Sequence, residues 1–328
     1  MNYTNNNSTD MFCGTICQLQ NDLYKYILPV IVVTGSIGNT ATLLVFRKGK
    51  FGKMSVGVYM YAYSVINLVN LFLIFGQSWV ADTFELENIG NLSEWTCKVW
   101  NFLYRVMTYS CVWFIVALTV DRYICVCHSL DAKRLCTVFL ANISVVFILV
   151  GLIFVSVHAM WSHANLDGKC TIYPYDDLHI TIWRWVSMSS YCFIPFIALF
   201  LLDARLIIAI WRKRKKLMKS QRSYTFTSAT LAISVMYLLL NLPATITNIM
   251  EYSEGSSRLS MERAISDFLS CGNPTIFFFM CLIFSKTFRS ELVLLLRKKA
   301  KTRNVSNDIN LPNINKYEYI ECASETFV

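Results

Sequence analysis

The chain has 328 residues, of which 55% are hydrophobic and only 16% are charged, and its formal net charge is +9. Its mean hydropathy of +0.44 lies outside the usual range for soluble domains and predicts a membrane protein. The positive charge is gathered in a few short segments between apolar stretches, which argues against nucleic acid as a partner.

Residues 1–25 are polar and rich in asparagine, without the apolar core of a cleavable signal peptide. We expect the first apolar segment to act as a signal anchor and this region to lie outside the cell and carry carbohydrate. Asn-X-Ser/Thr sequons mark the acceptors, and a further one falls after the second apolar segment. The expected glycosylation sites are Asn2, Asn6, Asn7 and Asn91. The pairing of Cys13 and Cys17 is left open.

Seven apolar segments follow, each close to or above the ~20 residues that a helix needs to cross a bilayer. They predict an all-α protein, with a bundle of seven transmembrane helices over residues 26–284. The expected spans are 26–46, 55–80, 99–124, 137–161, 186–211, 226–250 and 264–284.

The loops between the spans differ in charge and predict the orientation of the chain. Loop 47–53 has four Lys or Arg, loop 211–224 has seven, and 285–303 has seven against one Glu, whereas 81–96 has four acidic residues and no basic one. Basic loops stay on the cytoplasmic side of a membrane. We therefore expect a plasma-membrane protein with an extracellular N-terminus and a cytoplasmic C-terminus.

The residues after the last span divide into two parts. In 285–300, apolar residues recur at helical spacing beside cations, which predicts an amphipathic helix in contact with the lipid of the inner leaflet. Residues 301–328 are polar and predicted to be disordered. This tail ends with Thr326 two residues before Val328, a pattern that PDZ domains bind.

The third span contains the most informative motif. It is preceded by Cys97 in a polar context and ends in Asp121, Arg122 and Tyr123, so a carboxylate and a guanidinium meet at the membrane edge. The fifth, sixth and seventh spans contain proline in their interior, which removes a backbone hydrogen bond and kinks a helix. The expected hinges are Pro195, Pro243 and the adjacent Asn273 and Pro274.

Residues 26–297 resemble the rhodopsin-like (class A) G-protein-coupled receptors. The resemblance is carried by the order and spacing of Asn39, Cys97, Asp121-Arg122-Tyr123, Cys170, Pro195, Pro243, Asn273-Pro274 and Phe288-Arg289. It implies that a Cys97–Cys170 disulfide clamps the second outer loop over a ligand pocket. It also implies that Asp121, Arg122 and Tyr123 couple to a heterotrimeric G protein when the sixth helix swings outward, with arrestin as a further partner.

The short loop 211–224 and the truncated helix after Phe288 are similar to those of invertebrate neuropeptide receptors of the FMRFamide type, which implies an extracellular peptide ligand. Several family positions differ, however. Asn67 and Cys111 replace an acid and a serine, so sodium binding is not expected. The sixth span lacks the aromatic switch before Pro243, Phe277 replaces a tyrosine, and no acid faces Arg122 from the sixth span. These losses predict raised basal activity or a divergent activation route.

The expected ligand-pocket residues are Gln77, Tyr104, Arg105, Thr108 and Asp267. Charges inside a span are costly and face a cavity or a partner, so Arg105 and Asp267 either contact the ligand or pair with each other; Arg105 alone would also be able to snorkel outward. Tyr104 stands where amine receptors of the family have Asp, which argues against an amine ligand. The seventh span has no Lys for a retinal Schiff base.

The other polar residues fit less specific roles. We interpret Trp79, Trp161, Trp183 and Trp185 mainly as an interfacial belt, and we expect Asp203 to pair with Arg205 or a loop cation. Histidine spacing predicts no metal site, and no catalytic triad or phosphate loop appears, so neither an enzyme nor a cofactor is expected. The alternatives are a transporter or channel, which would favour internal repeats, and a receptor-like scaffold or ligand sink that no longer signals.

Overall fold

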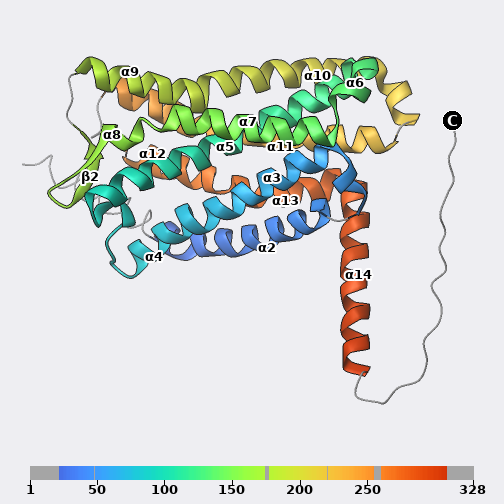
Figure 1. Ribbon diagram of the computed structural model, residues 1–328, viewed down its shortest axis with the longest axis horizontal. Coiled ribbons are helices and arrows are strands. Elements are labelled where there is room, and N and C mark those ends of the chain that lie inside the picture. The colour runs from blue at the N-terminus through green and yellow to red at the C-terminus, as the bar shows by residue number, and fades with distance from the viewer. Residues whose placement is uncertain (1–21, 48, 174–176, 220, 255–259, 309–328) are drawn as a thin grey trace, which may run out of the picture.

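The computed structural model describes residues 22–47, 49–173, 177–219, 221–254 and 260–308 (Figure 1). Several predicted sites lie outside these residues and are not placed. They are the glycosylation sites Asn2, Asn6 and Asn7, the cysteines Cys13 and Cys17, and the tail residues Thr326 and Val328. For Asp267 the helix is described but the side chain is not.

The chain is almost entirely helical. In order, its elements are η1 (Leu23–Ile27), α2 (Leu28–Arg47), η2 (Gly49–Lys53), α3 (Ser55–Val69), η3 (Asn70–Gly76), α4 (Gln77–Thr83), η4 (Ile89–Asn91), α5 (Glu94–Cys127), α6 (Ser129–Leu135), α7 (Val138–Ser156), α8 (Ala159–Ser162), β1 (His163–Leu166), β2 (Lys169–Ile172), α9 (Asp177–Met188), η5 (Ser189–Phe193), α10 (Ile194–Lys219), α11 (Gln221–Glu254), α12 (Ser260–Cys271), α13 (Asn273–Phe284) and α14 (Lys286–Asp308).

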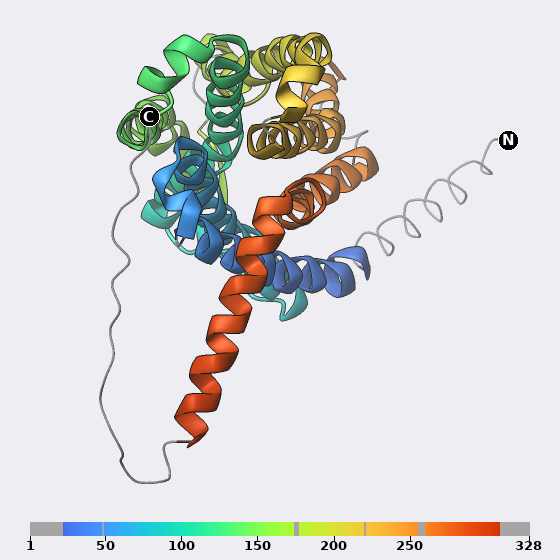
Figure 2. The ribbon, with the colours of Figure 1, turned by 90° about the vertical axis from the view of Figure 1, so that its right-hand side faces the viewer.

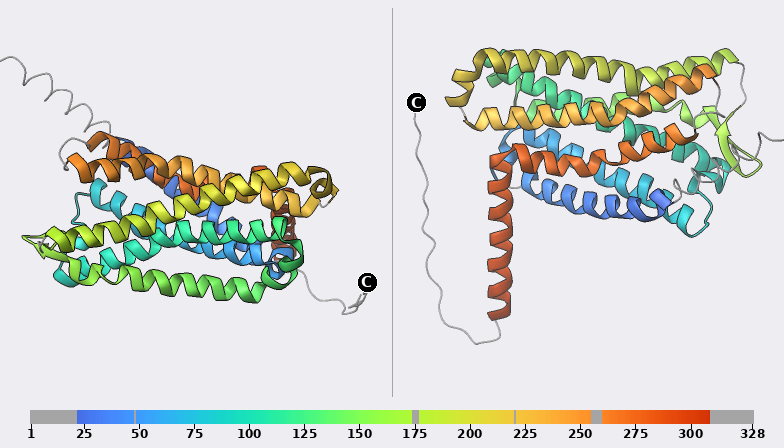
Figure 3. Two further views of the ribbon diagram at one scale, coloured as in Figure 1. Left: turned by 90° about the horizontal axis from the view of Figure 1, so that it is seen from above. Right: turned by 180° about the vertical axis from the view of Figure 1, so that it is seen from behind.

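The predicted helical bundle is confirmed. The long helices lie side by side (Figures 1 and 3). Within the described residues, six helical stretches are long and apolar enough to cross a membrane, and α13 is a shorter apolar helix. The six are Tyr24–Arg47, Ser55–Thr83, Glu94–Cys127, Val138–Ser162, Ile180–Arg212 and Phe226–Met250.

The seventh expected span, 264–284, is not one continuous helix. It divides at Gly272 into α12 and α13. The N–H of Gly272 donates to Leu269 O at 3.1 Å, three residues back, and Pro274 at the start of α13 has no N–H to continue the ladder. The predicted proline position thus coincides with a break in the helix.

The bundle is apolar outside and partly polar inside. On α7 the side chains of Phe139, Phe147 and Phe154 are more than two-thirds exposed, which is costly in water but favourable against lipid. In the interior Asn39 donates to the Pro274 carbonyl at 2.7 Å, and Asn67 donates to Asn39 Oδ1 at 3.1 Å. These hydrogen bonds join α2, α3 and α13 and satisfy polar groups in the interior of the bundle.

One end of the bundle holds a structure that the sequence analysis missed. β1 and β2 pair antiparallel, with His163 opposite Ile172, so the loop predicted as part of an all-α protein contains a hairpin. Its turn is Asp167-Gly168, with φ of 51° and 77°. Both values lie in the left-handed region that two-residue hairpin turns require and that Asp-Gly favours. We call this end of the bundle the hairpin end.

The opposite end carries α14, and we call it the α14 end. This helix lies across the bundle axis rather than along it (Figures 1 and 2), and it continues to Asp308, past the predicted end at residue 300. Phe288 fixes its first turn because the ring is fully buried, with centroids 5.7 Å from Phe46 and 6.1 Å from Phe278. Phe278, which packs on Phe288, also lies against Gly38 of α2. A Cβ added at Gly38 would be 2.7 Å from the Cβ of Phe278, so a larger residue there would clash with it.

Candidate functional site

A cavity of about 850 Å³ opens in the hairpin half of the bundle. Residues from all the membrane-spanning segments except α7 line the cavity, together with residues of the hairpin. The lining elements include α2, α3, η3, α5, α9, η5, α11, α12, α13, β1 and β2. A volume of this size suits a small ligand or the end of a larger one. Of the predicted pocket residues, Tyr104, Arg105 and Thr108 line the cavity. Gln77 does not, because its side-chain amide donates to Asn88 Oδ1 at 3.1 Å.

The disulfide predicted from the family resemblance is confirmed. Cys97, in the first turn of α5, is bonded to Cys170 of β2, with the two Cα atoms 5.4 Å apart. α5 begins at this point because Ser93 and Thr96 form a capping box. The bond therefore holds the hairpin against a fixed helix end, over the mouth of the cavity.

Asn91 reinforces this attachment. Its Oδ1 accepts the Cys170 N–H at 3.0 Å, and its carbonyl accepts Asn165 Nδ2 of β1 at 2.6 Å. The side chain is half-buried, so the predicted acceptor for carbohydrate has a structural role in the hairpin. Its glycosylation stays a prediction.

Arg105 places a positive charge in the wall of the cavity. Its Nη1 donates to Ser187 Oγ at 2.7 Å and to the Tyr109 hydroxyl at 3.3 Å. Both partners are neutral, and no Asp or Glu is among the described residues that line the cavity. These inward hydrogen bonds argue against the snorkelling alternative, in which the side chain would leave the bundle interior. The alternative pairing with Asp267 involves a side chain outside the described ones.

Two histidines lie beside Arg105, and the sequence analysis assigned them no role. His158 Nδ1 donates to the Val155 carbonyl at 2.7 Å, its Nε2 faces Ser187 Oγ at 3.5 Å, and its ring stacks on Trp183 at 4.3 Å. His163 begins β1 and is 7% exposed. Burial, and then the nearby charge of Arg105, lower the pKa of His163 to about 4, so this ring is neutral at physiological pH.

The floor of the cavity is formed by the predicted hinge regions. Tyr191 in η5, one turn before Pro195, donates to Asn241 Oδ1 in α11 at 3.3 Å. Pro243 lies inside α11, and both Asn273 and Pro274 line the cavity. The π-helical η5 ends two residues before Pro195, Pro243 lies inside α11, and Pro274 is in the first turn of α13. Each position lacks a backbone N–H donor, which permits a local bend.

The predicted charge pair of Asp121 and Arg122 lies in the last two turns of α5, at the α14 end. Arg122 Nε donates to Asp121 Oδ2 at 3.0 Å and Nη2 donates to the same oxygen. The two residues are only 4% and 5% exposed, so the pair neutralises a buried charge. Tyr123, the third residue of the motif, meets the ring of His128 edge to face at 5.6 Å.

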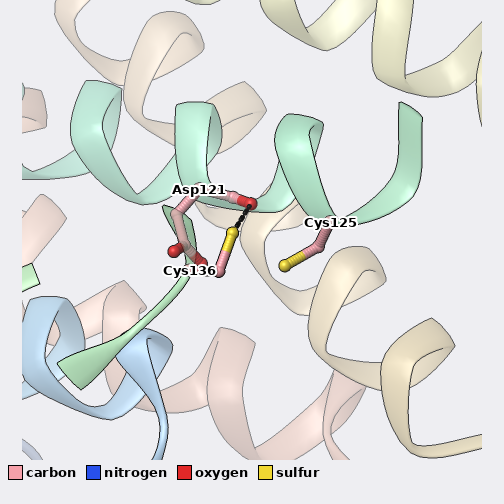
Figure 4. A group of neighbouring side chains, drawn as sticks. All are labelled: Asp121, Cys125 and Cys136. Atoms are coloured by element: carbon pink, nitrogen blue, oxygen red, sulfur yellow. Dashed lines mark hydrogen bonds between the residues drawn. The ribbon is translucent and has the colours of Figure 1, made fainter. Parts of the chain in front are cut away.

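Two thiols surround this pair. The side chains of Asp121, Cys125 and Cys136 place their donor atoms within 4.8 Å of one another (Figure 4). The carboxylate is already occupied by Arg122, whose Nη2 also reaches Cys125 Sγ at 3.3 Å, so a metal ion would have to displace a guanidinium. Burial raises the pKa of the Cys136 thiol. It therefore stays protonated and donates to the Asp121 carbonyl at 3.5 Å, which attaches the loop after α6 to α5.

The expected partner of Asp203 was wrong. Its Oδ1 accepts Ser234 Oγ of α11 at 2.8 Å, and Oδ2 has no hydrogen-bond partner. The residue is 5% exposed, so the nearby Arg205 does not reach it in the interior. Sequence proximity on one helix suggested Arg205, whereas packing of α10 on α11 supplies a hydroxyl.

The comparisons with known proteins agree with this arrangement. The model of the 7 transmembrane receptor (rhodopsin family) matches residues 38–287. A probable C-C chemokine receptor type 3 of Mus musculus is 27% identical over 38% of this chain and 34% of its own length. The probable G-protein coupled receptor B0563.6 of Caenorhabditis elegans is 24% identical over 83% of this chain and 69% of its own.

The growth hormone secretagogue receptor type 1 of Sus scrofa is 29% identical over 56% of this chain and 52% of its own length. The chain thus spans about a third of the mouse protein, half of the pig protein and two-thirds of the worm protein.

Proposed function

The chain belongs to the rhodopsin family of seven-transmembrane receptors, and we propose that it binds an extracellular ligand in the cavity and activates a heterotrimeric G protein. One observation carries the proposal. Helix α5 lines the cavity with Arg105 near the hairpin end, and the same helix ends in the buried Asp121–Arg122 pair at the α14 end. A ligand that moves this helix or its neighbours acts on both sites.

The hairpin end faces outward and the α14 end faces the cytoplasm in this proposal, with the plasma membrane as the location. The basic η2, with Lys50 and Lys53, lies at the α14 end, and the acidic segment 81–96 lies at the hairpin end. This supports the orientation by the positive-inside rule. A disulfide at the hairpin end fits the oxidising exterior.

In the proposed mechanism, ligand binding moves α11 outward and Arg122 leaves Asp121 to contact the G protein. Tyr191 and Asn241 join the cavity floor to α11, and Pro243 two residues beyond gives that helix a flexible point. Among the described residues Asp121 is the acid that pairs with Arg122. Nothing described on α11 holds Arg122 by charge, which favours easy release and measurable basal activity.

We propose a peptide as the ligand, although the relatives' names differ on this point: one names a chemokine and another a growth hormone secretagogue. The outward-opening cavity accommodates the end of a peptide, whose remainder would lie along the hairpin. Arrestin and a PDZ protein are further proposed partners at the cytoplasmic side. A pull-down with a peptide of residues 319–328, compared with its Val328→Asp form, tests the PDZ partner.

A second function is a receptor-like ligand sink that does not signal. Phe277 supports it, because this ring is 2% exposed and packs on Tyr63 at 4.7 Å but has no hydroxyl for a polar link during activation. In this case the cavity binds its ligand and Arg122 stays paired.

Expression in cultured cells with a G-protein dissociation reporter and a neuropeptide panel separates these functions. A peptide that evokes dissociation in the native chain and not in Arg122→Ala, at equal surface level, supports the receptor. Peptide binding without dissociation for any G-protein class supports the sink. Neither binding nor basal coupling at full surface expression contradicts both.

A further inference from the structure

We propose that the ligand carries a carboxylate and that the Arg105 guanidinium binds it at the wall of the cavity. This inference rests on the proposed function only in assuming that the cavity receives a ligand. The polar contacts of Arg105 explain why an acid fits this position.

Arg105 is a cation without a described counter-charge. A cation in a membrane-spanning bundle requires a counter-charge or water, and Arg105 makes no ion pair among the described residues. Its hydrogen bonds to Ser187 and Tyr109 both come from Nη1. The N–H groups on Nε and Nη2 have no described partner, and they form the planar fork that fits a carboxylate bidentately.

Hydrogen bonds hold the guanidinium of Arg105 in a fixed orientation. Ser187 Oγ accepts from Arg105 and lies 3.5 Å from His158 Nε2. Because His158 Nδ1 donates to a carbonyl, the neutral ring accepts at Nε2, and the chain of donors runs from Arg105 through Ser187 to His158. His158 is itself fixed by its stack on Trp183. The fork is thus oriented before any ligand arrives, which lowers the entropic cost of binding.

The charge of the cavity wall beside Arg105 limits the charge of the ligand group. His163 is neutral at physiological pH, since its pKa is lowered to about 4, so Arg105 supplies the full positive charge among the described side chains of this part of the wall. Arg184 also lines the cavity but is exposed at its rim. One guanidinium balances one negative charge, which favours a carboxylate over a phosphate dianion.

The remaining lining of the cavity indicates what the rest of the ligand is made of. Tyr104, Tyr191 and Trp183 line the cavity together with aliphatic side chains, so the group attached to the carboxylate is expected to be apolar or aromatic. A carboxylate attached to an apolar or aromatic group occurs at the free C-terminus of a peptide and in non-peptide organic acids. Both sources present the same carboxylate to Arg105, and the experiment separates them.

The test measures binding by the purified, detergent-solubilised receptor as a rise in its thermal unfolding temperature. Two pairs of probes differ only in charge: N-acetyltryptophan and its amide represent a peptide end, and 2-naphthoate and 2-naphthamide represent a non-peptide acid. We expect the acid of at least one pair to stabilise the receptor at a concentration at least tenfold lower than its amide. Preference in the first pair points to a peptide, and preference in the second to another organic acid.

Three variants show whether Arg105 is responsible. Arg105→Gln should bind acid and amide equally, Arg105→Lys should keep a weaker preference for the acid, and Arg184→Gln, at the rim, should keep most of it. If Arg105→Gln does not fold, two single variants decide the question. Arg105→Lys keeps the charge without the planar fork, and Ser187→Ala keeps the guanidinium but removes the hydroxyl that holds it. Each should show a smaller preference for the acid than the native chain.

The proposal is overturned if no acid stabilises the native chain more than its amide, or if the preference survives unchanged in Arg105→Gln or in both Arg105→Lys and Ser187→Ala. The readout involves no G protein. A receptor that binds acids without coupling therefore contradicts only the proposed signalling, and one that couples to neutral ligands contradicts only the carboxylate site.

Discussion

Helix α5 carries two arginines in the interior of the bundle, and they are satisfied in different ways. Arg122, at the α14 end, is 4% exposed and pairs with the carboxylate of its neighbour Asp121. Arg105, at the hairpin end, has the hydroxyls of Tyr109 and Ser187 as its partners among the described side chains. The charge of Arg122 is neutralised by its neighbour, whereas Arg105 faces a cavity. The proposed roles follow from this difference: Arg122 would be released on activation, and Arg105 would bind a ligand.

The largest expected effect comes from removing the paired arginine. Arg122→Ala leaves Asp121 buried without a counter-charge, which costs about 3–5 kcal/mol of unfolding free energy, and it should abolish G-protein activation. Arg105→Ala is the matched control on the same helix. It removes a cation that makes no ion pair with a described residue, so the ligand-free receptor should lose little stability or gain some. Thermal unfolding of both variants checks this, and equal losses would contradict the distinction between the two arginines.

The sequence predicted the Asp121–Arg122 pair completely and the Arg105 site only in part, for a physical reason. Asp121 and Arg122 are adjacent, so the chain itself brings them together. The partners of Arg105 come from α5, α9 and, through His158, the turn after α7. Their meeting depends on how three helices pack, and no spacing in the sequence encodes it.

The same distinction explains the other results. The spans were predictable because length and hydropathy suffice for a helix in lipid. The hairpin was missed because its strands have four residues each, too few for a periodic pattern, although Asp167-Gly168 is a turn signal that would have found it. Asp203 was assigned to a cation near in sequence, but Ser234 on another helix is its partner.

The hairpin end also depends on a covalent bond, which no described residue provides at the α14 end. Cys97→Ala opens a link between residues 73 positions apart and should cost about 2–4 kcal/mol, with loss of surface expression and of ligand binding. Cys170→Ala should give the same result, and the double variant should be no worse than either. Additive losses in the double variant would mean that the two cysteines act separately, whereas radioligand or probe binding equal to that of the native chain would mean that the clamp is dispensable.

A smaller effect is expected from pH at the hairpin end. The pKa of His163 is lowered from 6.5 to about 4, so the unfolded chain binds more protons than the folded one between these values. Stability is therefore full above pH 6.5 and falls as the pH drops toward 4, by on the order of 2–3 kcal/mol. His163→Asn should flatten this part of the profile of unfolding temperature against pH. An equal slope in the variant would assign the loss to other groups.

The smallest expected effect, close to zero, concerns sodium in the segment of α5 between the two arginines. Cys111 donates to Asn67 Oδ1 at 3.7 Å and accepts Asn70 Nδ2 at 3.0 Å, so thiol and amides fill the place where a carboxylate would be needed to hold the ion. The unfolding temperature should be the same in sodium chloride and potassium chloride of equal strength. Asn67→Asp, which supplies the missing charge, should make sodium the more stabilising salt. A sodium-specific rise in the unfolding temperature of the native chain would mean that this segment of α5 binds the ion without a carboxylate from Asn67 or Cys111. The segment would then bind an external charge, as proposed for Arg105, rather than be satisfied within the chain, as Arg122 is.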